Sequence, residues 1–215
     1  CRFANFLFKY WGKQYFISAK QSYNKWKFLA NGSHNTHSDY LTVNDERVTN
    51  TRFNETTFNT AIGYNSERIS SIVRFLYTRS IIGIPEEIGE QSTSKSKMLP
   101  YQDLTTKMLS LNNTFFLKNS KISTVLGYTE NKRNEFENHD EHSEDEEGAD
   151  HSEEEHHEYE NMEAALQLKL DTYSYDVKWH LPKLKNIETV IGAQGMHQKN
   201  KNFGEEILIP DATIN

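Results

Sequence analysis

Hydrophobic and polar residues alternate along most of this chain, which is the pattern of β-strands with two different faces. In residues 53–64, Phe58 and Ile62 share a parity with Tyr64, whereas the opposite parity carries small and polar side chains. The pattern predicts about nine or ten strands in all. The clearest cover residues 53–64, 68–79, 105–118 and 121–131. Residues 14–23 and 25–34 alternate more weakly, and residues 163–181 alternate less regularly.

The last of these segments changes parity along its length. Leu166 and Leu170 lie on one parity, whereas Tyr173 and Trp179 lie on the other. A β-bulge places one extra residue in a strand and would bring both groups to the same face. We therefore expect a bulge near Asp171.

Short and long connections alternate between the predicted strands. The short turns are expected at Asn24-Lys25, Asn65-Ser66, Asn119-Ser120 and Pro182–Asn186, and the long connections near 35–52, 80–104, 132–163 and from 199 onward. Tight turns at one end and long loops at the other are typical of outer-membrane barrels. Strands of about 10–13 residues also suit a tilted membrane crossing better than a soluble sheet. We predict an all-β fold, an antiparallel up-and-down transmembrane β-barrel present only in part.

Aromatic residues near the strand ends support the same interpretation. Transmembrane barrels carry girdles of aromatic side chains at the two membrane interfaces. The residues expected to form such girdles here are Tyr64, Tyr77, Tyr128 and Trp179.

Composition narrows the class of protein further. The chain has 35% hydrophobic and 12% aromatic residues, which suits strands that are apolar on one face only. It contains one cysteine and no dinucleotide fingerprint, phosphate-binding glycine loop or nucleophile elbow. We therefore expect no enzyme activity and no required cofactor. The net charge of −7 argues against a nucleic-acid partner.

Half of the acidity is concentrated in one segment. Residues 134–163 hold 15 of the 31 aspartates and glutamates, five of the nine histidines, and no lysine or arginine. Imidazole is a ligand for zinc, copper and nickel, and carboxylates complete such coordination shells. The candidate metal ligands are His139, His142, His151, His156 and His157, with Asp140, Glu141, Glu155 and Glu158 beside them.

Three interpretations of this acidic segment remain open. As a transition-metal site, it would collect the ion with many weak ligands and steer cations by its negative field. As a calcium or magnesium site, it would use only its carboxylates. As a solvated acidic loop, it would bind nothing. Weaker candidates for a site on the same side are His34, His37 and His197.

Four stretches of the chain resemble the barrel of TonB-dependent outer-membrane receptors, particularly those of Bacteroidetes-type bacteria. They are Asn50–Glu55 (NTRFNE), Gly83–Gly89 (GIPEEIG), Ser110–Asn113 (SLNN) and Asn202–Ala212 (NFGEEILIPDA). Together with the alternation of short and long connections, the resemblance extends over most of the sequence. The order and spacing of the stretches carry it more than any one of them.

The resemblance implies an outer-membrane receptor that imports a scarce nutrient through a barrel of about 22 strands. An N-terminal plug and a segment that engages the TonB energy-coupling complex complete such a receptor, and we expect neither in this chain. Residues 1–215 would be a partial barrel in contact with outer-membrane lipid, and 132–163 an extracellular loop within it. Family members that take up zinc have similar His- and acid-rich loops, which makes zinc the first expected cargo.

Two alternatives to a metal receptor stay open. The first is a receptor for an iron siderophore or another metal chelate, in which the acidic segment is only a spacer. The second, from a different class, is a soluble all-β binding or adhesive module with one acidic loop. Both are compatible with the alternating pattern, because a soluble sheet can also carry one apolar face.

Overall fold

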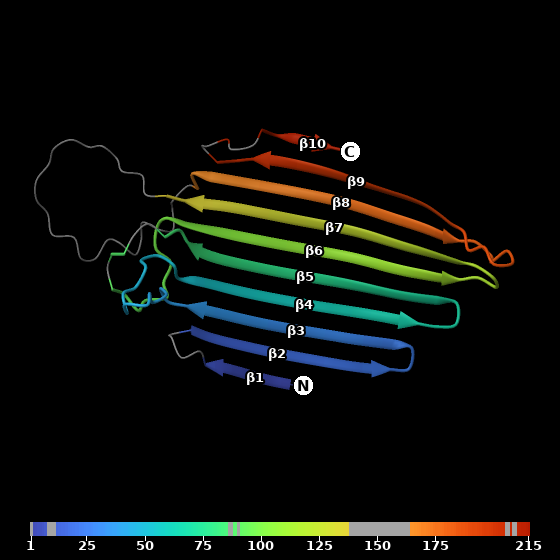
Figure 1. The fold of residues 1–215 in the computed structure, drawn as a ribbon, viewed down its shortest axis with the longest axis horizontal. Coiled ribbons are helices and arrows are strands. Elements are labelled where there is room, and N and C mark those ends of the chain that lie inside the picture. The colour runs from blue at the N-terminus through green and yellow to red at the C-terminus, as the bar shows by residue number, and fades with distance from the viewer. Residues whose placement is uncertain are drawn as a thin grey trace, which may run out of the picture.

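The computed structural model describes residues 2–7, 12–85, 88–89, 91–137, 164–204, 207 and 210–215, with side chains from residue 12 onward. The regular secondary structure in these ranges consists of β-strands alone (Figure 1). The strands are β1 (Arg2–Leu7), β2 (Gly12–Tyr23), β3 (Trp26–His37), β4 (Phe53–Asn65), β5 (Ile69–Gly83), β6 (Tyr101–Phe116), β7 (Lys121–Phe136), β8 (Leu166–His180), β9 (Val190–Asn202) and β10 (Ala212–Ile214).

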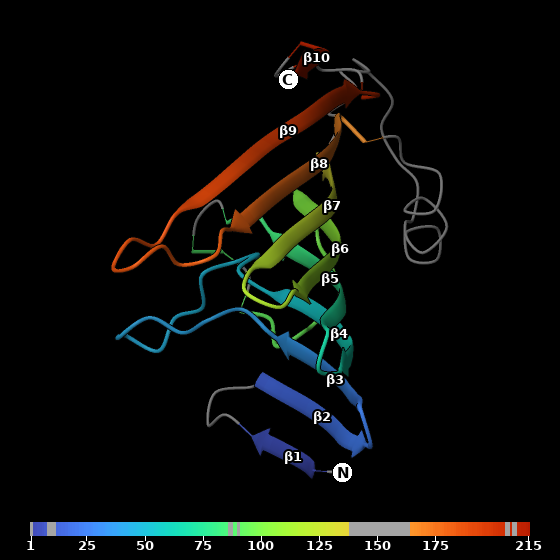
Figure 2. The same cartoon turned by 90° about the vertical axis from the view of Figure 1, so that its right-hand side faces the viewer.

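The ten strands form a single antiparallel sheet in which each strand pairs with its neighbours in sequence. This confirms the predicted all-β, up-and-down fold. The sheet is twisted and open, with β1 and β10 at its two edges (Figures 1 and 2). An open sheet of this order is consistent with part of a barrel. Within the described residues, no helix is long and apolar enough to span a membrane.

The connections expected from the sequence lie at the expected ends of the strands. The predicted short ones, including a turn at Asn24 with φ of 50°, lie together at one end, the short-turn edge (Figure 1). The predicted long ones lie at the other end, the long-connection edge, together with the four-residue connection between β1 and β2. Several strands reach further toward that edge than the alternation suggests: β3 continues to His37, β5 to Gly83 and β7 to Phe136. Backbone pairing thus continues where the apolar alternation ends, because polar cross-strand pairs replace it.

The prediction of a bulge near Asp171 is wrong. β8 pairs with β7 in one unbroken register from Glu135↔Leu166 to Lys121↔His180, and its pairing with β9 is equally regular. Leu166 and Tyr173 therefore lie on opposite faces of the sheet. The parity changes because the apolar side chains of β8 lie on one face near Leu166 and on the opposite face from Tyr173 onward.

The register defines two faces, named here after Phe58 and Thr57 in β4. The Phe58 face carries Ile17, Tyr77, Leu126 and the residues in register with them. The Thr57 face carries mostly small and polar side chains. Of the described residues, few are buried, and nearly all of those lie at the long-connection edge: Ser38, Asp39, Arg47, Asn50, Arg52, Leu99, Tyr101, Ala165 and Leu166, with Ala61 further along β4.

Candidate functional site

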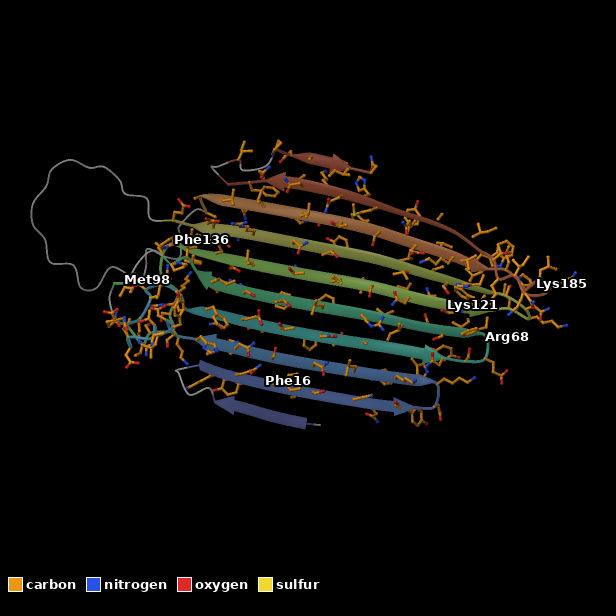
Figure 3. All side chains as sticks on the ribbon, in the orientation of Figure 1. Phe16, Arg68, Met98, Lys121, Phe136 and Lys185 are labelled. Carbon is orange, nitrogen blue, oxygen red and sulfur yellow. The ribbon has the colours of Figure 1, made fainter. Side chains whose placement is uncertain are left out.

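The predicted metal ligands lie outside the described residues. The loop expected over 132–163 begins later than predicted, because residues 132–136 are paired within β7. The rest of the acidic segment connects β7, which ends at Phe136, to β8, which begins at Leu166, and both of these ends lie at the long-connection edge. Figure 3 labels Phe136 and Met98 at this edge, and Arg68, Lys121 and Lys185 at the opposite one. The predicted ligands that lie outside the described residues are His139, Asp140, Glu141, His142, His151, Glu155, His156, His157 and Glu158.

The described residues bring together no group of three or more His, Cys, Asp or Glu side chains that could hold a metal ion. The three weaker histidine candidates are separated. His34 lies on the Phe58 face, where its Nδ1 is 2.9 Å from the Thr56 hydroxyl. His37 stacks on Phe53 at the long-connection edge, and His197 lies beside Tyr173 in mid-strand. They do not form a shared site.

Phe136, the last residue of β7, is fixed beside the root of the acidic segment. Its ring stacks on Tyr101, its direct partner in β6, with the centroids 4.7 Å apart. The Nζ atom of Lys97 donates to the Tyr101 hydroxyl at 2.9 Å. The connection between β5 and β6 is thus linked, through Tyr101 in β6, to the end of the strand from which the acidic segment continues.

A buried ion pair joins the long connections next to it. Arg52 donates to the Asp39 carboxylate from its backbone N at 2.8 Å, from Nε at 3.1 Å and from Nη2 at 2.5 Å. Its Nη1 donates to the carbonyl of Ser96 at 3.2 Å. The two side chains are 7% and 0% exposed. Sequence reasoning missed this pair, although Arg52 lies in the NTRFNE stretch.

Asn50 provides a second link between the same connections. Its Nδ2 donates to the carbonyls of Ile84 at 3.1 Å and Pro100 at 2.6 Å. A Cβ atom on Gly83 would stand 2.2 Å from Asn50 Oδ1, so only glycine fits there. Asn50 itself has φ of 60°, a left-handed conformation that asparagine tolerates. These hydrogen bonds hold the β3–β4 connection (38–52) against the β5–β6 connection (84–100). The two joined connections are called the platform below.

A cavity of about 400 Å³ opens beside the platform, lined in part by Arg52, Phe53, Lys95 and Lys97. Burial, followed by the charge of Lys13, lowers the pKa of Lys95. Among the described residues that line the cavity, two are lysines and one is the paired Arg52, and none is a carboxylate, cysteine or histidine. Ammonium groups repel metal cations, and the cavity therefore does not suit a metal ion.

The Phe58 face carries an apolar band toward the short-turn edge. Its large side chains have no protein cover and are between 37% and 68% exposed. The residues of this apolar band are Tyr23, Trp26, Phe28, Ile62, Val73, Leu109, Phe115, Leu126, Tyr173, Tyr175, Val177, Trp179 and Ile191. In β2 and β4 the same face also exposes Tyr15, Ile17 and Phe58, nearer the long-connection edge. The predicted girdle residues Tyr64 and Trp179 lie at its short-turn end, whereas Tyr77 and Tyr128 lie in mid-strand.

Three polar side chains within the apolar band are hydrogen-bonded to one another. Asn113 in β6 is the direct cross-strand partner of Ser71 and of Thr124. Ser71 donates to the Asn113 carbonyl, and the Asn113 amide donates to Thr124 at 3.4 Å. This arrangement is what a nonpolar solvent requires, because it offers no hydrogen bonds of its own.

Beyond the apolar band, the same face becomes charged toward the long-connection edge. Glu130 pairs with Lys107 at 3.0 Å and with Lys169 at 3.2 Å, and Lys169 also pairs with Asp171 at 3.1 Å. Tyr128 donates to Asp171 at 2.8 Å. From β5 to β9, the Phe58 face thus changes from apolar to charged toward the long-connection edge.

Polar cross-strand pairs join neighbouring strands on the Thr57 face, from mid-strand toward the long-connection edge. Thr106 donates to Asn131 at 2.9 Å, and Gln198 donates to Thr172 at 3.1 Å. Near the platform, Glu55 accepts from Ser80 at 3.2 Å. Such a surface is suited to contact with water.

Comparisons with protein-family models, with curated proteins and with solved structures found no match to this chain.

Proposed function

We propose that this chain is part of the β-barrel of an outer-membrane receptor that imports a scarce nutrient, with a transition metal, zinc first, as its cargo. The observation that carries the barrel proposal is the apolar band. In β5 to β9 it occupies the short-turn side of one face, while the long connections lie beyond its other margin.

The strands are long enough to cross a bilayer, and the apolar band covers part of such a crossing. In β8 the band runs from Trp179 to Tyr173, which is about 20 Å along a strand that rises roughly 3.3 Å per residue. Transmembrane barrels present an apolar band about 25 Å tall on strands tilted by roughly 35–45°, so this run corresponds to about 15 Å of that height. The strands β4 to β9 have 13 to 16 residues, more than the roughly 9–11 that a crossing needs. The surplus is the charged part near the long connections.

Lipid is the solvent that stabilises this surface. Removing a large apolar side chain from water contributes about 1.5–3 kcal/mol when burial is complete. A soluble sheet achieves this by packing against a second layer. In the described part of this chain no second layer covers the Phe58 face, and its side chains are exposed. The Thr57 face would then line the barrel interior.

The cargo proposal rests on the composition of the acidic segment and on where that segment leaves the sheet. Its roots lie at the long-connection edge, the side that outer-membrane barrels turn outward. Imidazoles and carboxylates there would bind zinc or another transition-metal ion before it enters the barrel. The Asp39–Arg52 pair and Asn50 would hold the neighbouring connections in place around this entrance.

The test of the cargo is calorimetric titration of zinc into the full-length protein in detergent. The deletion should remove residues 138–163 only, because Asn134, Glu135 and Phe136 pair within the sheet. Glu135 and Leu166 are direct partners, so a short glycine-serine linker joins the cut ends. A second variant replaces the five histidines of the segment with glutamine and keeps both length and formal charge.

We expect zinc binding to be lost in both variants and kept in His180→Gln, the matched control at the opposite edge. Loss in the deletion variant alone would assign binding to the carboxylates. Equal zinc binding in all variants would refute the cargo proposal. Barrel and soluble module are distinguished by flotation: a soluble module would stay behind when phosphatidylcholine vesicles rise through a density gradient.

A further inference from the structure

Three lysines lie side by side on the Phe58 face near the long-connection edge. Lys132 in β7 is the direct cross-strand partner of Lys169 in β8, which is in turn the direct partner of Lys201 in β9. Neighbouring strands are about 4.8 Å apart, so this lysine row spans roughly 10 Å. Like charges directly opposite each other destabilise a sheet. The lysine row therefore favours a bound anion.

The protein's own carboxylates neutralise the row only in part. Lys169 is held by Glu130 at 3.2 Å and by Asp171 at 3.1 Å. Within the described part of the chain, Lys132 and Lys201 form no ion pair, and both are exposed. The adjoining positions add two further lysines, Lys107 and Lys199, of which Lys107 shares Glu130.

Asp211 is the third carboxylate near these lysines. It accepts hydrogen bonds from the backbone N of Asn202 at 2.8 Å and from its Nδ2 at 3.0 Å. These bonds, together with the charges of Lys201 and Lys199, lower the pKa of Asp211, so it is ionised near neutral pH. Even with Asp211 counted, the five lysines outnumber the three carboxylates, and the surface keeps a positive charge.

The position of the lysine row relative to the apolar band indicates the source of the anion. Tyr128 and Tyr173 are direct partners whose rings lie 4.9 Å apart at the margin of the band. Lys132 and Lys169 stand four residues beyond them, about 13 Å along the strands. In the proposed orientation, the tyrosines lie at the interface and the lysines lie in the headgroup layer.

We propose that the lysine row binds the phosphate groups of a phosphorylated lipid headgroup in the leaflet on the long-connection side. This inference rests on the proposed membrane function. The row lies about 13 Å beyond the margin of the apolar band on an open strand surface. At this position it faces a lipid's headgroup while the lipid's chains cover the band. Lysine stems pack along apolar surface and extend their charge toward phosphates.

The test uses the full-length protein in phosphatidylcholine nanodiscs doped with a diphosphorylated glycolipid. Native mass spectrometry measures the fraction of protein that retains the glycolipid. The variant is Lys132→Gln/Lys201→Gln, which leaves the ion pairs of Lys169 intact. The matched control, Lys118→Gln/Lys185→Gln, removes the same charge at the short-turn edge. We expect the variant to bind the glycolipid about tenfold or more weakly and the control to be unchanged.

Equal retention in variant and wild type, in discs that both proteins enter, would overturn this inference and leave the membrane proposal standing. Failure of the wild type to enter phosphatidylcholine discs would overturn both. Displacement of the glycolipid by millimolar inorganic phosphate would assign the row to a free anion and overturn the lipid assignment. Binding that emerges only after removal of residues 138–163 would assign the lysines to the acidic segment instead.

Discussion

Replacing Asp39 by alanine should loosen the long connections without unfolding the sheet. The Asp39 carboxylate accepts three hydrogen bonds from Arg52, at 2.8, 3.1 and 2.5 Å, and is 0% exposed. Removing one partner of a buried ion pair leaves the other charge uncompensated and costs about 3–5 kcal/mol. The strands keep their own backbone pairing, so we expect this cost to fall on the connections around residues 38–52 and 91–100.

Hydrogen exchange followed by mass spectrometry measures this effect segment by segment. A local cost of about 3–5 kcal/mol corresponds to exchange that is roughly 100-fold faster or more, up to the limit at which the segment is already open. Peptides from β5 and β6 should be unchanged. Glu46→Ala removes an exposed carboxylate from the same connection and serves as the control.

A double variant, Asp39→Leu/Arg52→Met, strengthens the test. Replacing a buried ion pair with apolar residues of similar volume is often neutral, whereas breaking it is costly. The double variant should therefore exchange more slowly than Asp39→Ala. Exchange in Asp39→Ala within about threefold of Glu46→Ala would refute the reasoning, because the ion pair would then contribute no more than an exposed charge.

Three further outcomes are expected. Gly83→Ala places a Cβ 2.2 Å from Asn50 Oδ1 and should destabilise the platform by about 1–3 kcal/mol in denaturant melts, whereas Gly63→Ala, with its nearest contact at 3.7 Å, should be near neutral. Burial lowers the pKa of His37. Because the unfolded chain then binds the proton more tightly, stability should fall as pH drops through about 6.5, and His37→Asn should flatten this dependence between pH 7 and 5. Asn113→Ala leaves the hydroxyls of Ser71 and Thr124 without this partner in the apolar band. It should lower the free energy of unfolding by about 1–3 kcal/mol in lipid-reconstituted protein. Unchanged stability would argue against a stabilising role of these hydrogen bonds.

The strands could be predicted because the alternation of apolar and polar residues within each strand is a local property of the sequence. Alternation in residues 53–64 depends on one strand meeting two different surroundings, and it locates β4 without knowledge of its neighbours. The same reasoning failed for β8. Leu166, Leu170 and Tyr173 were assigned to one apolar face, but the apolar side chains of this strand lie on different faces at its two ends. A bulge was invoked to explain what is a regular strand.

The platform was not predictable, because its contacts join residues far apart in sequence. Asp39 meets Arg52 across 13 positions, and Arg52 meets the carbonyl of Ser96 across 44. Neither connection has a periodicity that would place it over the end of the sheet. The lysine row was hidden for a related reason: Lys132, Lys169 and Lys201 become neighbours only through the register of β7, β8 and β9.

The sequence by itself determined the all-β class, the up-and-down order, and the grouping of short and long connections at opposite ends, because these follow from local alternation and from connection length. It also located the acidic, histidine-containing segment, a property of composition alone. Only the tertiary structure decided the register, and with it the apolar band, the ion pairs beyond that band and the platform. The physical reason is that a sheet assembles its surfaces from residues on several strands, and one-residue changes in register would exchange its two faces.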